Sequence, residues 1–170
     1  YIGVLATGWN VVDTAAARRV GIVVTNVPAY STQSVAQLVF AHILNLCRAV
    51  ETHARSDWSR AEDFSCSLTP QVELTGLTLG IVGFGSIGRA VAGAALAFGM
   101  NVIVCTRTPS GIDLPQVRAV SLEELLRTAD IVSLHCPLTE KNAGLMDRTA
   151  FAAMKRTAIF INTARGGLVD

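Results

Sequence analysis

Three short polar segments of this chain each follow an apolar run, and the first could bind a dinucleotide. It reads Gly83-x-Gly85-x-x-Gly88 and lies between an apolar run at 77–82 and a segment with helical periodicity at 87–98. After a strand, the first glycine permits a tight turn, the second lets a pyrophosphate approach the backbone, and the third lets helix and strand pack closely. The N-terminus of the helix offers free N–H groups to the phosphates. This context favours dinucleotide binding over a purely structural glycine turn.

The other two segments run from His135 to Thr139 and from Asn162 to Gly167. Open parallel sheets bind ligands beyond the carboxyl ends of their strands, so both segments are expected at the same edge as the glycine turn. Arg165 is of most interest, because its small neighbours leave it room. A planar guanidinium can grip a small carboxylate with two hydrogen bonds and can polarise a carbonyl. The alternative is an arginine in a solvated surface loop.

The three histidines are weaker candidates for acid–base chemistry. His42 lies on the apolar stripe of an expected helix and is interpreted as packed or interfacial, whereas His53 lies in a polar stretch and is interpreted as solvated. His135 ends an apolar run at the expected cofactor edge, where its backbone should matter more than its ring. No metal motif is predicted, because no histidine lies near a His, Cys or carboxylate at ligand spacing. No nucleophile elbow or P-loop occurs either.

Alternating apolar runs and helical patterns must position these segments. Fully apolar strands that alternate with helices indicate a parallel sheet covered on both faces. A long helix between two α/β segments suggests a crossing between domains, and its apolar stripe is formed by Val35, Leu38, Val39, His42, Leu46 and Ala49. Strands are expected at 2–6, 22–25, 77–82, 101–105, 119–120, 130–135 and 158–162, and helices at 11–19, 31–49, 87–98, 121–128 and 148–154.

Composition narrows the class of protein. The 170 residues are 51% hydrophobic with a net charge of +1, which excludes global disorder and gives no basic field for nucleic acid or a membrane surface. No signal peptide or apolar run of transmembrane length is visible. The four cysteines are widely spaced, which favours reduced thiols and a cytoplasmic location. The chain starts within an apparent strand and stops just past another, so we expect it to be an internal fragment of a longer enzyme.

Taken together, five motifs resemble the D-isomer-specific 2-hydroxyacid dehydrogenases, and most closely their glycerate dehydrogenase/hydroxypyruvate reductase branch. The motifs lie at 6–13 (ATGWNVVD), 26–36 (NVPAYSTQSVA), 83–88 (GFGSIG), 135–139 (HCPLT) and 162–170 (NTARGGLVD). The resemblance implies a bi-lobed enzyme that moves a hydride between a nicotinamide and the C2 atom of a small 2-keto or 2-hydroxy acid. It also implies a homodimer, formed in part through the helix at 31–49.

The resemblance further implies a division of the chain and roles for its residues. Residues 1–29 would end a flavodoxin-like substrate domain, 30–76 would form the interdomain helix and connection, and 77–170 would form a Rossmann-type, doubly wound NAD(P)-binding domain. Arg165 would be catalytic, Thr7 and Gly8 would bind the substrate carboxylate through their backbone, and Tyr30 would lie on the substrate side. Cofactor binding is expected at Gly83, Gly85, Ser86, Ile87, Gly88, Thr106, Arg107, His135, Cys136, Pro137, Thr139, Thr163 and Ala164.

Two departures from the family pattern matter. The catalytic Glu and His of the family follow the arginine and would fall past residue 170, so the segment 1–170 alone is expected to be inactive. Thr106 stands where NAD-specific sites carry an acidic residue, and no Asp or Glu occurs between Glu73 and Asp113. Because Arg107 could bind a 2′-phosphate, either NAD or NADP is expected, with NADPH tolerated. The alternatives are a dinucleotide-sensing corepressor and a formate or phosphite dehydrogenase relative.

Overall fold

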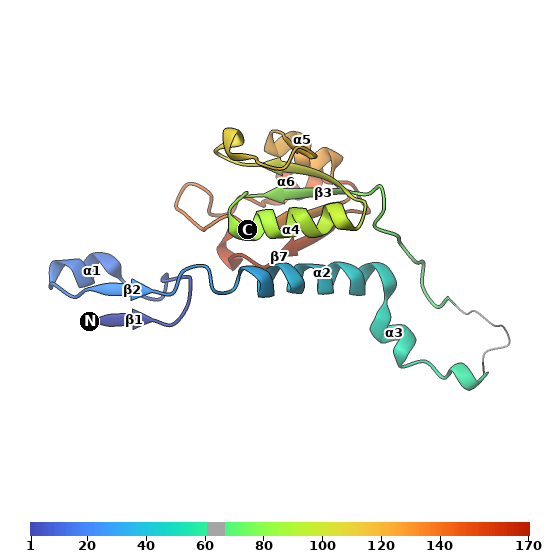
Figure 1. Cartoon of the computed structure of the whole chain (residues 1–170), viewed down its shortest axis with the longest axis horizontal. Helices are drawn as coiled ribbons and strands as arrows, with labels where there is room; N and C mark the ends of the chain where they lie inside the picture. The colour runs from blue at the N-terminus through green and yellow to red at the C-terminus, as the bar shows by residue number, and fades with distance from the viewer. Residues whose placement is uncertain (61–66) are drawn as a thin grey trace.

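The computed structural model describes residues 1–60 and 67–170, and its main feature is a five-stranded sheet (Figure 1). Its strands are β3 (Thr78–Val82), β4 (Asn101–Cys105), β5 (Val117–Ala119), β6 (Ile131–Leu134) and β7 (Ile159–Asn162). The spatial order is β5-β4-β3-β6-β7, and every neighbouring pair is parallel. The central strands β3 and β6 are mostly apolar and almost wholly buried, because helices cover the sheet on both faces. The predicted parallel α/β fold is confirmed, with strand ends within two residues of those expected.

Helices cover the two faces of the sheet as a doubly wound fold requires. On one face α2 (Thr32–Arg48) packs against α4 (Ser86–Ala97), and on the other α5 (Leu122–Thr128) packs against α6 (Arg148–Ala153) (Figure 1). Shorter helices are α3 (Val50–Ala54) and the 3₁₀ turns η1 (Trp58–Arg60), η2 (Pro109–Gly111) and η3 (Gly166–Leu168). Across the described residues, none of these helices could span a bilayer.

The buried face of α2 differs from the expected stripe. Its buried residues are Ala36, Val39, Phe40, Ile43 and Cys47, and the Phe40 ring stacks on Phe98 with centroids 5.2 Å apart. Leu38 and Leu46 are 48% and 58% exposed, and His42 is exposed beside them. Of the apolar stripe named from the sequence, Val39 is buried and Val35 and Ala49 are half-buried, so the stripe only partly coincides with the face that packs on the sheet. The helix carries two apolar faces of the same period, and α4 takes the one next to the sheet.

His53 was expected in solvent, but the structure gives it a packing role. The ring is half-buried and stacks on Trp58, with centroids 6.0 Å apart. Its Nδ1 donates to the Ala49 carbonyl oxygen (2.9 Å), and its Nε2 accepts from the Leu68 backbone N–H (3.2 Å). His53 therefore joins α3 to the chain that leads into β3, far from the glycine turn.

A smaller unit lies beyond the N-terminal end of α2, apart from the large sheet (Figure 1). It consists of β1 (Ile2–Val4), α1 (Thr14–Arg19) and β2 (Val24–Asn26), with β1 and β2 paired in parallel. Both strands are shorter than expected. The helix begins at residue 14 rather than 11 because the Asp13 side chain caps it, accepting from the Ala16 backbone N–H (2.8 Å).

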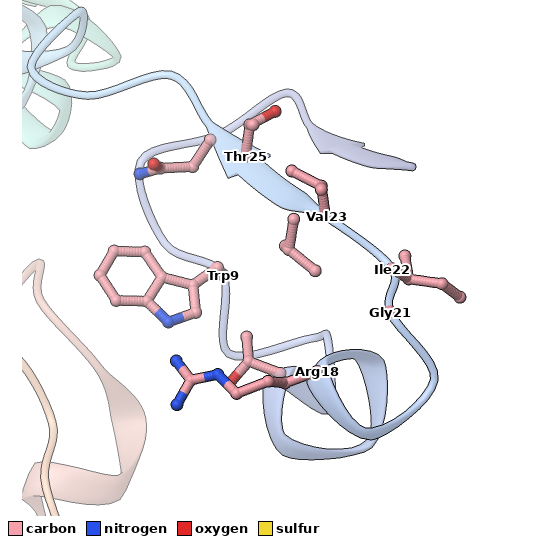
Figure 2. A pocket seen from close by; sticks show the side chains of 9 residues that line it. Trp9, Arg18, Gly21, Ile22, Val23 and Thr25 are labelled. Carbon is pink, nitrogen blue, oxygen red and sulfur yellow. The ribbon is translucent and has the colours of Figure 1, made fainter.

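A cavity of about 570 Å³ lies in this unit between α1 and β2 (Figure 2). Trp9 and Arg18 line it together with residues 21–26. Val23, one of its lining residues, is 61% exposed, so the face is open rather than enclosed. None of the residues predicted to bind cofactor or substrate lines this cavity, and it is therefore separate from the candidate site.

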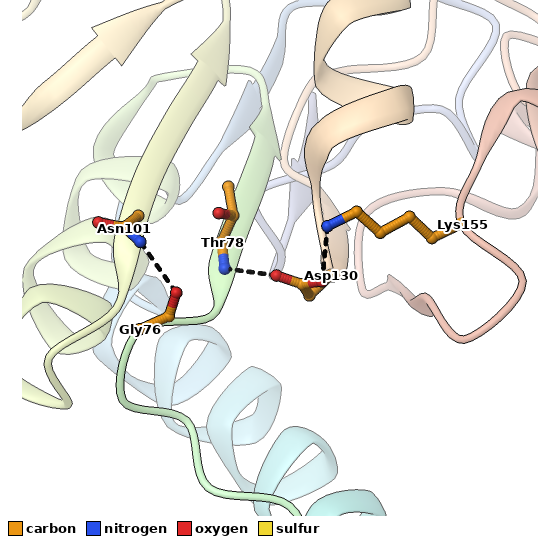
Figure 3. A network of polar contacts seen from close by, with 5 residues as sticks. All are labelled: Gly76, Thr78, Asn101, Asp130 and Lys155. Carbon is orange, nitrogen blue, oxygen red and sulfur yellow. Dashed lines mark hydrogen bonds and ion pairs between the residues drawn. The ribbon is translucent and has the colours of Figure 1, made fainter.

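A polar network holds the starting edge of the large sheet (Figure 3). The Asp130 carboxylate accepts from the Thr78 backbone N–H (2.8 Å) and from Lys155 Nζ (2.7 Å), and Asn101 Nδ2 donates to the Gly76 carbonyl oxygen (2.9 Å). Partial burial acts to raise the pKa of Asp130, but the Lys155 hydrogen bond, the Thr78 hydrogen bond and the Lys155 charge outweigh it and lower that pKa. This edge is structural, and the candidate site lies at the opposite edge.

Candidate functional site

The glycine turn has the backbone geometry that phosphate binding requires. Gly83 has φ +96°, and a Cβ there would lie 2.7 Å from the Cys136 backbone nitrogen. A Cβ on Gly88 would collide with the Gly83 carbonyl oxygen, whereas Gly85 faces open space. Helix α4 begins at Ser86, so its first N–H groups face the same space. Sterics thus fix two of the glycines, and the third leaves room for a ligand.

A cavity of about 940 Å³ opens beside this turn and joins the carboxyl ends of β3, β4 and β6. Most of the predicted cofactor residues line it, namely Gly83, Gly85, Thr106, Arg107, His135, Cys136, Pro137 and Thr139. Ser86, Ile87 and Gly88 lie next to it in the first turn of α4, but Thr163 and Ala164 follow β7 and do not line it. The Thr163 hydroxyl oxygen is buried without a hydrogen-bond partner. The structure therefore gathers three strand ends around one cavity.

The β4 side of the cavity is basic rather than acidic. Thr106, Arg107 and Thr108 line it directly after the strand, and the Thr108 backbone N–H donates to Thr106 Oγ1 (3.4 Å). No carboxylate stands among these residues to accept from a ribose 2′-hydroxyl. Glu140 is the acidic residue that lines the cavity, and it lies on the opposite wall after β6.

His135 ends β6 with its backbone and ring both engaged. Its N–H donates to the Val82 carbonyl oxygen (2.7 Å), and its Nε2 lies 2.9 Å from the buried Ser133 hydroxyl oxygen. Burial lowers the pKa of His135 from its ordinary 6.5 to about 4. The imidazole is therefore neutral near pH 7, and its Nε2 is engaged with Ser133 in the wall of the cavity.

Asn142 closes the wall that follows β6, and the sequence analysis missed it. Its Oδ1 accepts from the Thr139 backbone N–H (2.6 Å) and hydroxyl (2.9 Å), and its Nδ2 donates to the Pro137 carbonyl oxygen (2.8 Å). Asparagine side chains commonly bind nearby backbone groups in turns, and that chemistry was the available signal. Asn142 thus fixes the turn that carries Pro137 and Thr139.

Arg165 lies just past β7 and reaches the N-terminal unit. Its Nε donates to Asn10 Oδ1 (3.3 Å), and its Nη1 donates to the Ala164 carbonyl oxygen (2.8 Å). Its Nη2 lies so close to Gly8 that a Cβ there would collide with it. The side chain is exposed yet held, which separates it from a free surface arginine. Asn10 could not be predicted as a site residue, because its contact with Arg165 joins residues 155 positions apart.

The loop beside Arg165 presents backbone donors. Asn26 Nδ2 donates to the Thr7 carbonyl oxygen (2.9 Å), and Thr7 Oγ1 donates to the Val27 carbonyl oxygen (3.3 Å). Among the described backbone hydrogen bonds, none uses the N–H of Thr7 or Gly8. Tyr30 is exposed, and no described contact joins it to Arg165. Gly8 is therefore a neighbour of Arg165, and its N–H and that of the preceding Thr7 have no partner among the described hydrogen bonds.

Comparison with known proteins assigns the family. Residues 40–170 match the sequence profile of the D-isomer specific 2-hydroxyacid dehydrogenase, NAD binding domain. The chain belongs to this family. The matched range contains the glycine turn, the cavity and Arg165, and with them three of the five motifs, so the family expected from the sequence is confirmed.

Individual relatives of this dehydrogenase family agree over nearly the whole chain. It is 38% identical to a hydroxypyruvate reductase of Blautia hydrogenotrophica and 40% identical to a glycerate dehydrogenase of Methylorubrum extorquens, covering 99% of this chain and 54% and 53% of theirs. The crystal structure of the TT0316 protein from Thermus thermophilus superposes with a TM-score of 0.86 at 46% identity, over 97% of this chain and 52% of that one. The chain spans about half the length of these relatives.

The site residues fit the nicotinamide dinucleotide that the family name implies. The cradle at Gly83 and Gly88 has no room for side chains, while Gly85 leaves space for a phosphate group beside the N-terminus of α4. Within the described part of the chain, no group of three or more His, Cys, Asp or Glu could hold a metal ion. The backbone of this edge is therefore compatible with a bound dinucleotide.

Proposed function

We propose that this chain supplies the cofactor site and part of the substrate site of a nicotinamide-dependent D-2-hydroxyacid dehydrogenase. One observation carries the proposal: the Arg165 guanidinium meets Gly8 at the sheet edge that also holds the glycine turn. A dinucleotide site alone would need no such arginine. A guanidinium beside free backbone N–H groups is suited to a small carboxylate.

In this proposal the chain's own groups bind and orient the substrate. Arg165 Nη2 and the N–H groups of Thr7 and Gly8 take the carboxylate, and the guanidinium polarises the neighbouring C2 carbonyl. Asn10 and the Ala164 carbonyl hold the guanidinium in place. The nicotinamide, when bound, exchanges a hydride with C2. The neutral His135 ring is assigned to the cavity wall and not to proton transfer.

We propose a glycerate- or hydroxypyruvate-like substrate, with Tyr30 on the substrate side as a weaker assignment. The names of the two relatives, hydroxypyruvate reductase and glycerate dehydrogenase, support this branch. For the cofactor, the absence of a carboxylate at Thr106 and the presence of Arg107 support tolerance of NADPH as well as NADH. Thr163 and Ala164 remain proposed cofactor contacts.

We further propose a cytoplasmic homodimer. The exposed apolar face of α2, which carries Leu38 and Leu46, is suited to a second copy of the chain. The described cysteines Cys47, Cys105 and Cys136 are free, as is usual for a reducing compartment. Burial raises the pKa of all three thiols, so they stay protonated near pH 7.

The test uses the full-length protein with a panel of substrates. Hydroxypyruvate, glyoxylate and pyruvate are each supplied with NADH and with NADPH, and oxidation of the cofactor is followed by absorbance. The proposal expects reduction of at least one 2-keto acid. Binding of a dinucleotide without turnover of any of them would favour a sensor of the corepressor type. Oxidation of formate or phosphite instead would assign the third alternative.

A further inference from the structure

Arg89 joins the glycine turn to the segment that follows β4. Its side chain makes an ion pair with Asp113 and donates from Nη2 to the Gly111 carbonyl oxygen (2.6 Å). Its guanidinium carbon also lies 4.8 Å from the centroid of the Phe84 ring, a cation–π contact. Three different partners therefore hold one planar group.

The two ends of this link border the same cavity. Phe84 is a buried residue of the turn and lines the cavity, and Arg89 lies one helical turn beyond Gly85, to whose carbonyl its N–H donates (3.0 Å). Gly111 and Asp113 belong to residues 106–113, which we call the β4 segment. The β4 segment begins with Thr106 and Arg107, which line the same cavity as the turn. Arg89 therefore fixes the spacing between the turn and the cavity's β4 side.

The contact also determines where a charge lies. Asp113 is the first carboxylate after the glycine motif, and Arg89 holds it at the start of α4. An exposed ion pair contributes little to global stability, and the Asp113 side chain is 70% exposed. The Arg89 contacts therefore act through geometry: the guanidinium lies on Phe84 of the turn and binds Asp113 and Gly111, which orders the β4 segment.

We propose that Arg89 is a positioning residue that orders the β4 segment for the ribose of the cofactor and thereby favours NADPH. The inference rests on the proposed function. A disordered β4 segment would lose its contacts to the 2′-substituent, and charge-assisted bonds from Arg107 to a 2′-phosphate are stronger than neutral bonds to a 2′-hydroxyl. Loss of Arg89 should therefore weaken NADPH binding more than NADH binding.

The test compares Arg89→Lys and Asp113→Asn in the full-length protein. Lysine keeps the charge but cannot bind Asp113 and Gly111 as a fork. Dissociation constants for NADH and NADPH are measured by titration, followed by KM and kcat. Arg127→Lys is the matched control, because Arg127 makes an exposed ion pair with Glu123 within α5, away from the cavity.

We expect both variants to raise the Kd for NADPH about five- to tenfold and to raise the NADPH-to-NADH ratio of Kd values at least about threefold. The KM for NADPH should rise while kcat changes less. The Kd for NADPH in the double variant should be close to that in either single variant. Unchanged Kd values in Arg89→Lys, or equal weakening of NADH and NADPH binding, would overturn this inference but not the proposed function. A wild type that binds neither dinucleotide would overturn the proposed function and this inference with it.

Discussion

Arg165→Lys is the sharpest perturbation of the proposed substrate site. In the structure Nε and Nη1 of Arg165 are held by Asn10 and the Ala164 carbonyl, and Nη2 lies against Gly8. Lysine carries one nitrogen in place of three. It can keep an anchoring contact or approach Gly8, but it cannot do both.

The expected loss follows from these contacts. A hydrogen bond to a charged group contributes about 1.5–3 kcal/mol, and a bidentate grip on a carboxylate loses at least one such bond together with the alignment of the other. We therefore expect the variant to lose about 2–4 kcal/mol of transition-state stabilisation, so that kcat/KM falls about 30- to 1,000-fold. The glycine turn and the cavity lie on other strands, so the Kd for the cofactor should stay within about twofold of wild type.

The assay is steady-state reduction of the best 2-keto acid by the full-length enzyme, together with titration of the cofactor. Arg156→Lys is the matched control, since Arg156 is exposed and precedes β7 where Arg165 follows it. A kcat/KM for Arg165→Lys equal to that of the control would refute the assignment of the carboxylate to Arg165. A large rise in the cofactor Kd would show that the two halves of the site are not separate.

Four further predictions concern the cavity. A Cβ on Gly85 would face open space, so Gly85→Ala should keep the free energy of unfolding within about 0.5 kcal/mol of wild type while weakening NADH binding. Gly83→Ala should cost about 1–3 kcal/mol by urea unfolding, because φ is +96° and the Cβ has no room. Buried neutral His135 has a folded pKa of about 4 against 6.5 unfolded, so stability is full above pH 6.5 and is lost as pH falls toward 4. The slope should approach about 1.4 kcal/mol per pH unit and be absent in His135→Asn; equal slopes would contradict the burial argument. Thr106→Asp should shift the kcat/KM ratio toward NADH by at least about tenfold, and a wild type that already rejects NADPH a thousandfold would show that another residue selects the cofactor.

The sheet and its cofactor edge were predictable because their signals are local. Largely apolar strands, a glycine turn and a helix that starts at Ser121 each depend on residues close together in the chain, and the structure confirms them. Ser121 and Glu124 have the residue types of a capping box, but only one of its two hydrogen bonds forms. Glu124 N–H donates to Ser121 Oγ (3.1 Å), but the Glu124 carboxylate accepts from Arg118 (2.7 Å) instead of reaching back. Arg118 in β5 binds the Glu124 carboxylate in place of the Ser121 backbone, and the capping-box motif does not include this residue.

The burial of α2 could not be predicted because both of its apolar faces have helical period. One face carries Phe40 and Ile43 and the other carries Leu38 and Leu46, and periodicity alone does not choose between them. The choice is made by α4 and by Phe98, which are distant in sequence. Asn10 and Asp113 were missed for the same reason, since their partners lie 155 and 24 residues away.

The two halves of the candidate site are built differently, and this difference explains why their variants should separate. The cofactor half rests on buried strands and on Gly83 and Gly88, whose neighbours leave no room for side chains. Such packing is cooperative and tolerates few changes. The substrate half rests on contacts of Arg165 with the loop at Thr7–Asn10, made by exposed side chains. Substrate affinity should therefore depend on the position of the N-terminal unit relative to Arg165, whereas dinucleotide binding should depend on the large sheet alone.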